Sequence, residues 1–176
     1  SPGLRRPPPL AGLARTLGVM KRALTTISAL FLALPVSAGE TQSSVSVNSV
    51  SVHLLFTPSG ELSEDVTALP GFGSWNFRTV NRVEPVDEPF HSFLIKVRLQ
   101  STGSVFRKGK VATVTVRSLQ RKKLLYSASL NNVYIPEEGE AVMAKLVEGH
   151  VCEPIEILVR AGKSQVRKTV EFNCGE

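Results

Sequence analysis

The chain has few of the residues on which enzymes and metal proteins commonly depend. It contains two cysteines, three histidines and one tryptophan among 176 residues. His53, His91 and His150 are far apart in sequence and form neither a His-x-His nor a His-x-x-x-His pair, so no zinc site is predicted. No Gly-x-Ser-x-Gly or Ser-x-x-Lys motif occurs. We therefore assign no catalytic residue, metal or cofactor, and favour a protein that is not an enzyme.

The sequence also lacks an apolar run that suits a membrane span. A bilayer core needs about 20 apolar residues, whereas residues 23–34 form a shorter run interrupted by Thr and Ser. This run follows the basic start Met20-Lys21-Arg22 and precedes small residues up to Ala38. The pattern predicts a secretory signal peptide that is cut after Ala38. We thus expect an unpacked upstream or cloning-derived segment (1–19), a signal peptide (20–38) and one exported domain (39–176), periplasmic or extracellular.

The net charge of +6 is mostly a property of the predicted leader. Residues 1–38 hold five of the 21 basic side chains and none of the 15 acidic ones, which leaves +1 for the predicted mature chain. A charge so close to zero gives no reason to expect nucleic acid as a partner. The remaining length is sufficient for one domain with its own hydrophobic core.

Alternation of apolar and polar residues predicts strands through most of the mature chain. Val45 and Val47 alternate with serine, and the pattern resumes in the opposite phase from Val50 to Phe56, which indicates a bulge at Asn48-Ser49. The later apolar faces are predicted at Phe93, Ile95, Val97, Leu99, Ala112, Val114, Val116, Leu124, Tyr126, Ala128, Leu130, Val133, Ile135, Val142, Ala144, Leu146, Ile155, Ile157, Val159, Val166, Val170 and Phe172. No helical period is sustained after the leader. We predict an all-β, antiparallel β-sandwich of seven or eight strands, immunoglobulin-like or fibronectin-like.

The two cysteines are placed symmetrically about a predicted turn at 161–164. In a hairpin folded there, Cys152 and Cys174 face each other, and an oxidising compartment favours a disulfide. Such a bridge typically stabilises a domain by about 2–4 kcal/mol. The alternative is that Cys152 serves as a metal ligand or nucleophile near His150. A copper site of the electron-transfer kind requires His and Met soon after the cysteine, but Glu153-Pro154-Ile155 follows.

The single tryptophan lies in an aromatic stretch, residues 69–77, that also contains two glycines. Phe72, Trp75 and Phe77 on an adaptable backbone could present rings to a sugar or a peptide. Alternatively, Trp75 fills the core between two sheets, because large aromatic side chains are mostly buried. We favour the core interpretation and keep the three rings as candidate ligand-binding residues.

Basic residues are concentrated in the middle of the chain. Residues 89–136 hold nine basic and no acidic side chains, whereas 39–88 and 137–176 have net charges of −5 and −3. Two clusters, Arg107-Lys108-Gly109-Lys110 and Arg121-Lys122-Lys123, fall at candidate turns and strand ends. Such clusters can bind phosphate or carboxylate groups. The alternative, which we favour, is a solvated face that discourages aggregation through strand edges.

Two function classes remain open. The first is an exported, non-catalytic binding or protein-interaction domain that holds a protein, a glycan or an acidic envelope component. The second is an exported enzyme or metal-binding protein whose site is assembled from scattered histidine and acidic residues. The absence of a catalytic signature favours the first. Its candidate ligand-binding residues are Phe72, Trp75, Phe77, Arg107, Lys108, Lys110, Arg121, Lys122 and Lys123.

Overall fold

The computed structural model describes residues 44–79, 83–84, 88–137, 139–149 and 152–173. All of them belong to one compact unit, Glu40–Glu176. The predicted upstream segment and signal peptide lie outside the described residues, as do His150 and Cys174. The described part is all-β, which confirms the predicted fold class, and it contains no helix that could cross a membrane.

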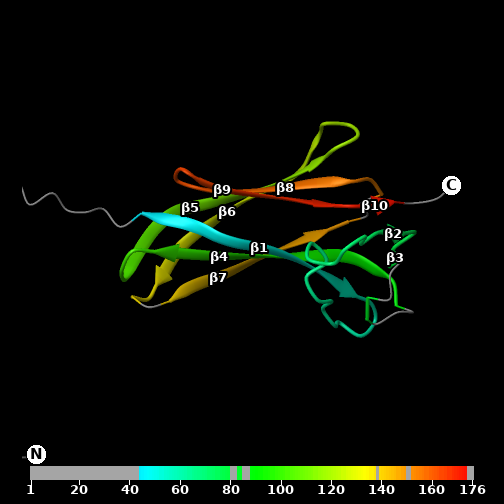
Figure 1. Ribbon diagram of the computed structural model, residues 1–176, viewed down its shortest axis with the longest axis horizontal. Helices are drawn as coiled ribbons and strands as arrows, with labels where there is room; N and C mark the ends of the chain where they lie inside the picture. Colours follow the sequence, from blue (N-terminus) through cyan, green and yellow to red (C-terminus); the bar gives the residue numbers. More distant parts are fainter. Residues whose placement is uncertain (1–43, 80–82, 85–87, 138, 150–151, 174–176) are drawn as a thin grey trace, which may run out of the picture. The chain divides into compact units, whose positions relative to one another are not determined.

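Within the described residues, seven long strands form two antiparallel sheets (Figure 1). The first sheet has the order β1-β4-β7, and the second has the order β6-β5-β8-β9. Their bounds are β1 (Val45–Phe56), β4 (Phe90–Ser101), β5 (Val105–Ser118), β6 (Leu124–Ile135), β7 (Glu140–Glu148), β8 (Ile155–Ala161) and β9 (Ser164–Val170).

Three two-residue strands form a small additional sheet of order β10-β2-β3. Here β2 (Ser74–Trp75) pairs in parallel with β10 (Phe172–Asn173) and antiparallel with β3 (Arg78–Thr79). The last residues of the described chain are therefore joined by backbone pairing to the aromatic stretch near the middle of the sequence.

The core lies between one face of each main sheet, as the alternation predicted for most strands. Ile95 and Val97 of β4 and Val114 and Ile157 of the second sheet are fully buried in a single cluster. Burying these apolar faces against each other is what holds a two-sheet arrangement together. The arrangement is therefore that of a β-sandwich.

The bulge predicted in β1 is confirmed. The pairing of β1 with β4 shifts register between Val47 and Ser49. An extra residue at this point reverses which side chains face the core. As a result Val47 and Val50 are both buried although they are three residues apart.

The predicted core face of β7 is wrong. Val142 and Leu146 are 55% and 38% exposed, and Ala144 is exposed as well. The register pairs Val147 with Phe93 and Met143 with Val97, which places the other set of residues on the core side. Residues 141–147 contain apolar side chains in both phases, so only the pairing with β4 determines which set is buried.

The prediction for the start of β6 also needs correction. Leu124 is 47% exposed, and Tyr126 and Ala128 are only half-buried, whereas Leu130 is fully buried. The change of phase predicted beyond Asn131-Asn132 is confirmed, since Val133 and Ile135 are buried.

Candidate functional site

The first basic cluster lies where β5 departs from regular pairing with β6. The sequence predicts a turn or strand end at this cluster, but β5 continues through Gly109 with register shifts on both sides of Lys110. Gly109 has a φ of +76°, which glycine adopts without strain, and its N–H donates to Oδ1 of Asn132 at 2.8 Å. Bulges of this kind redirect side chains that would otherwise alternate strictly between faces. Consequently Arg107, Lys108 and Lys110 all line the same hollow.

We call this hollow, about 770 Å³ in volume, the basic groove. Its other walls come from the start of β1 and from the turn between β8 and β9. A hydrogen bond from the Val47 N–H to Oγ of Ser164, at 3.1 Å, ties these two walls together. The lining residues are Ser44, Val45, Ser46, Arg107, Lys108, Lys110, Val111, Gly162, Lys163 and Ser164.

Lys163 is a member of this site that the sequence did not reveal. It lies more than fifty residues from the first basic cluster and reaches the groove only because β8 pairs with β5 and the β8–β9 turn then lies beside the start of β1. With Lys163, the part of the lining that the structure describes contains four basic side chains and no acidic one. A concave surface lined by one sign of charge raises the local concentration of oppositely charged ligands. The groove is therefore suited to anions.

The second basic cluster lies beyond the other end of β5, separated from the groove by most of that strand. Arg121 forms an ion pair with Glu153, and its Nε donates to Oε2 of that carboxylate at 3.0 Å. Ser118 also donates to Glu153, which is only 4% exposed. The hydrogen bond from Arg121 lowers the pKa of the Glu153 carboxyl, against the opposing effect of burial. Arg121 thus has a structural partner, while Lys122 and Lys123 are exposed.

The basic residues of 89–136 are therefore divided between sites. Arg98 lies in the first sheet and pairs with Glu140 at 3.1 Å. Arg107 and its neighbours line the groove at the start of β5, and Arg121 neutralises Glu153 beyond its end. The structure brings together the first cluster of the predicted residues and separates it from the second.

The interpretation that Trp75 fills the core is wrong. Trp75 is 54% exposed, whereas its neighbour Ser74 is 2% exposed. Successive residues of a strand point to opposite faces, and in β2 the serine takes the inner position. The core space here is filled by Phe72 and Phe172, whose rings meet edge to face with centroids 6.3 Å apart. Phe77 is half-buried against Phe90, so the three candidate rings do not form a common binding surface.

The histidines do not converge within the described residues. The Ser51 hydroxyl donates to Nε2 of His53 at 3.0 Å, and Nδ1 of this ring donates to the Ser63 carbonyl at 2.8 Å. This contact has the form of a nucleophile–base pair, but its orienting group is a backbone carbonyl rather than a carboxylate. His91 packs instead against Phe77. No group of three or more His, Cys, Asp or Glu side chains that could hold a metal ion occurs in the described part of the chain.

The predicted disulfide falls partly outside the described residues. Cys152 is described and exposed, but Cys174 is not described, so the bridge stays a prediction. The hairpin that it would close is present, with Ile155 of β8 opposite Val170 of β9.

No protein-family model matches the chain, and no curated protein sequence matches it significantly.

Proposed function

We propose that this protein is an exported, non-catalytic binding domain that holds a carboxylate-rich partner in the basic groove. The observation that carries the proposal is the convergence of four basic side chains around a hollow of about 770 Å³, with no acidic one among the lining residues that the structure describes. This volume lies in the range of about 300–1,000 Å³ that is typical of ligand pockets.

The composition of the groove favours carboxylates spaced along a chain over a single compact anion. Three of its four basic residues are lysines, namely Lys108, Lys110 and Lys163. A lysine ammonium is a hydrated point charge on a flexible stem, whereas arginine presents a rigid fork to one planar or tetrahedral anion. An acidic segment of an envelope protein or an acidic glycan offers such repeated carboxylates.

We further propose that the sandwich is immunoglobulin-like, of the fibronectin-like variety. Counted in chain order among the seven long strands, β1, β4 and β7 are the first, second and fifth, and they form one sheet. The other sheet contains β6, β5, β8 and β9, which are the fourth, third, sixth and seventh. Immunoglobulin constant domains have the same arrangement except that their fourth strand joins the first sheet. Binding sites in such sandwiches commonly lie among the loops at their ends. The β8–β9 turn in the groove is consistent with that placement.

Export is supported by the sequence of the leader. Residues 20–38 combine a basic start, a short apolar run and small residues before the expected cut. A periplasmic or extracellular location would give the groove access to acidic polymers of the cell envelope.

The proposal is tested by titrating the purified protein with fluorescent poly-glutamate and polygalacturonate. We expect binding that weakens as salt rises from about 0.05 to 0.5 M, because the screening length falls below about 10 Å in this range. Comparing the two polymers distinguishes a peptide from a glycan ligand.

Two double variants with the same net charge distinguish binding in the basic groove from attraction to the overall charge of the protein. Lys108→Gln/Lys163→Gln removes two groove charges, and Lys122→Gln/Lys123→Gln removes two exposed charges beyond the far end of β5. We expect at least a tenfold loss of affinity in the first variant only, with the stability of both within about 0.5 kcal/mol of the parent. Equal losses in both variants would refute a specific role for the groove.

A further inference from the structure

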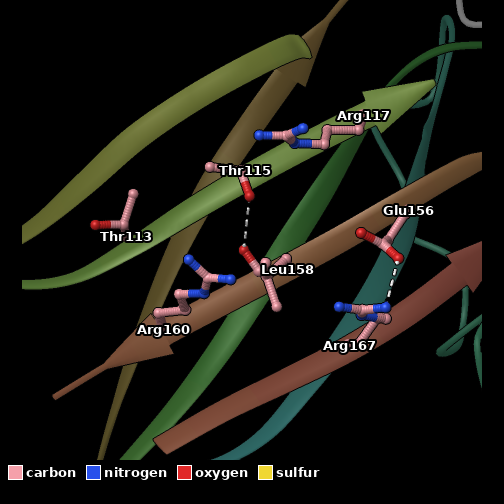
Figure 2. A pocket seen from close by; sticks show the side chains of 7 residues that line it. All are labelled: Thr113, Thr115, Arg117, Glu156, Leu158, Arg160 and Arg167. Atoms are coloured by element: carbon pink, nitrogen blue, oxygen red, sulfur yellow. Dashed lines mark hydrogen bonds and ion pairs between the residues drawn. The ribbon is translucent and has the colours of Figure 1, made fainter. Parts of the chain in front are cut away.

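The outer face of the second sheet carries another hollow, which shares no residue with the basic groove (Figure 2). Its volume is about 380 Å³. The register places Arg117 opposite Glu156 and Thr115 opposite Leu158 between β5 and β8, and Leu158 opposite Arg167 of β9. Directly opposed residues share a face of a sheet. The lining is therefore built on three adjacent strands: Thr113, Thr115, Arg117, Glu156, Leu158, Arg160 and Arg167.

The floor of this hollow is apolar although it lies away from the core. Leu158 is only 9% exposed, yet it does not belong to the core cluster between the sheets. The aliphatic stems of long neighbouring side chains can cover such a residue while their charged ends stay in water. The Thr115 hydroxyl donates to the Leu158 carbonyl at 3.2 Å, which fixes the middle of the floor.

The walls carry three guanidinium groups and one carboxylate, a net charge of +2. Arg167 uses one nitrogen, Nη1, to contact Oε2 of Glu156 at 3.2 Å. Arg160 donates from Nε to the side-chain oxygen of Gln165 at 3.3 Å, which orients its guanidinium. Arg117 takes part in none of the ion pairs found within the described residues. Figure 2 shows Arg117 and Arg160 on either side of the Thr115–Leu158 hydrogen bond.

We propose that this hollow binds the phosphate group of a small phosphomonoester. Near neutral pH such a group carries close to two negative charges and three acceptor oxygens, which matches the net charge of the hollow. Guanidinium forks bind phosphate oxygens bidentately, and the Thr113 hydroxyl supplies a further donor. The volume of about 380 Å³ lies in the range of about 300–1,000 Å³ that is typical of small-molecule pockets. The proposal does not depend on the function assigned to the basic groove.

The ligand class is tested by isothermal titration calorimetry of the purified protein with phenyl phosphate and phenyl sulfate at pH 7.5 and fixed ionic strength. The two probes have similar shapes, but the sulfate ester carries one negative charge. We expect phenyl phosphate to bind at least tenfold more tightly. Equal affinities, or no heat from either probe, would overturn the proposal. Binding to phosphatidate vesicles without binding to phenyl phosphate would also overturn it, in favour of a membrane surface.

Variants locate the binding to this hollow. Arg117→Gln/Arg160→Gln should weaken phenyl phosphate binding at least tenfold, and Arg117→Lys/Arg160→Lys should give an intermediate loss, because charge remains but the forks are removed. Lys108→Gln/Lys163→Gln, in the basic groove, should bind as the parent does. Circular dichroism verifies that each variant is folded. If the double variant does not fold, phenyl phosphate binding is measured in the single variant Arg117→Gln instead. Unchanged affinity in the folded arginine variants would refute the site.

Discussion

At the scale of single residues, the contact with Glu153 gives one arginine of a basic cluster a structural role that its neighbours do not share. In sequence, Arg121 is one of three adjacent cations. In the structure it neutralises a buried carboxylate from the segment before β8. The same turn is held by a hydrogen bond from the Leu119 N–H to the Pro154 carbonyl at 2.9 Å. The cluster thus contains one structural arginine and two exposed lysines.

We predict that Arg121→Gln lowers the melting temperature at pH 7, because it leaves the buried Glu153 carboxylate without its cation. The pKa of Glu153 is lowered in the folded protein. Its ionised form therefore contributes stability above the unfolded-state pKa, and this contribution is lost as the pH falls through the folded-state pKa. The difference between parent and variant should accordingly shrink on acidification.

Thermal denaturation followed by circular dichroism at pH 7 and at about pH 3 measures this difference. Lys122→Gln is the control, since Lys122 is an exposed neighbour in the same turn. We expect the control to melt with the parent at both pH values. A deficit in Arg121→Gln that did not change with pH would argue against the role of Glu153 ionisation.

At the scale of elements, β7 and β5 show two ways in which pairing overrides a local pattern. In β7 both faces are apolar enough to be buried, and the register with β4 selects the face that contains Met143 and Val147. In β5 the isolated Gly109 looked like a turn, but a glycine within a strand can equally mark a bulge. That bulge is what gathers the basic side chains of the groove.

The register of β7 predicts opposite outcomes for the same substitution at two valines. Val147→Asp buries an unpaired charge at a position that is 4% exposed, and should cost on the order of 3 kcal/mol or more of unfolding free energy. Val142→Asp, at a position that is 55% exposed, should change stability by about 0.5 kcal/mol or less. Urea denaturation measures both. The assigned register would be contradicted if Val142→Asp were the more damaging variant.

At the scale of the whole molecule, export and the disulfide are linked, because an oxidising compartment is what favours the bridge. We predict that protein recovered from the envelope of an expressing cell begins at Gly39 and contains the Cys152–Cys174 bond. Intact-mass measurement before and after reduction tests both points, since the bond makes the oxidised chain lighter by two hydrogens. A Met20 terminus would indicate an uncleaved anchor, and an unchanged mass on reduction would exclude the bridge.

The sequence by itself determined the all-β class, most of the core and the bulge in β1. These features follow from local alternation, which reports directly which side chains avoid water. The tertiary structure alone decided the exposure of Trp75, the buried face of β7 and the membership of both hollows. Trp75 alternates with a serine that takes the inner position in a two-residue strand. Lys163 and Arg167 reach their sites because the β8–β9 hairpin pairs with β5, which is distant in sequence. A periodic pattern predicts which face of a strand is buried, but it does not predict which strand lies beside it. The charge of each hollow depends on the side chains that the neighbouring strands contribute.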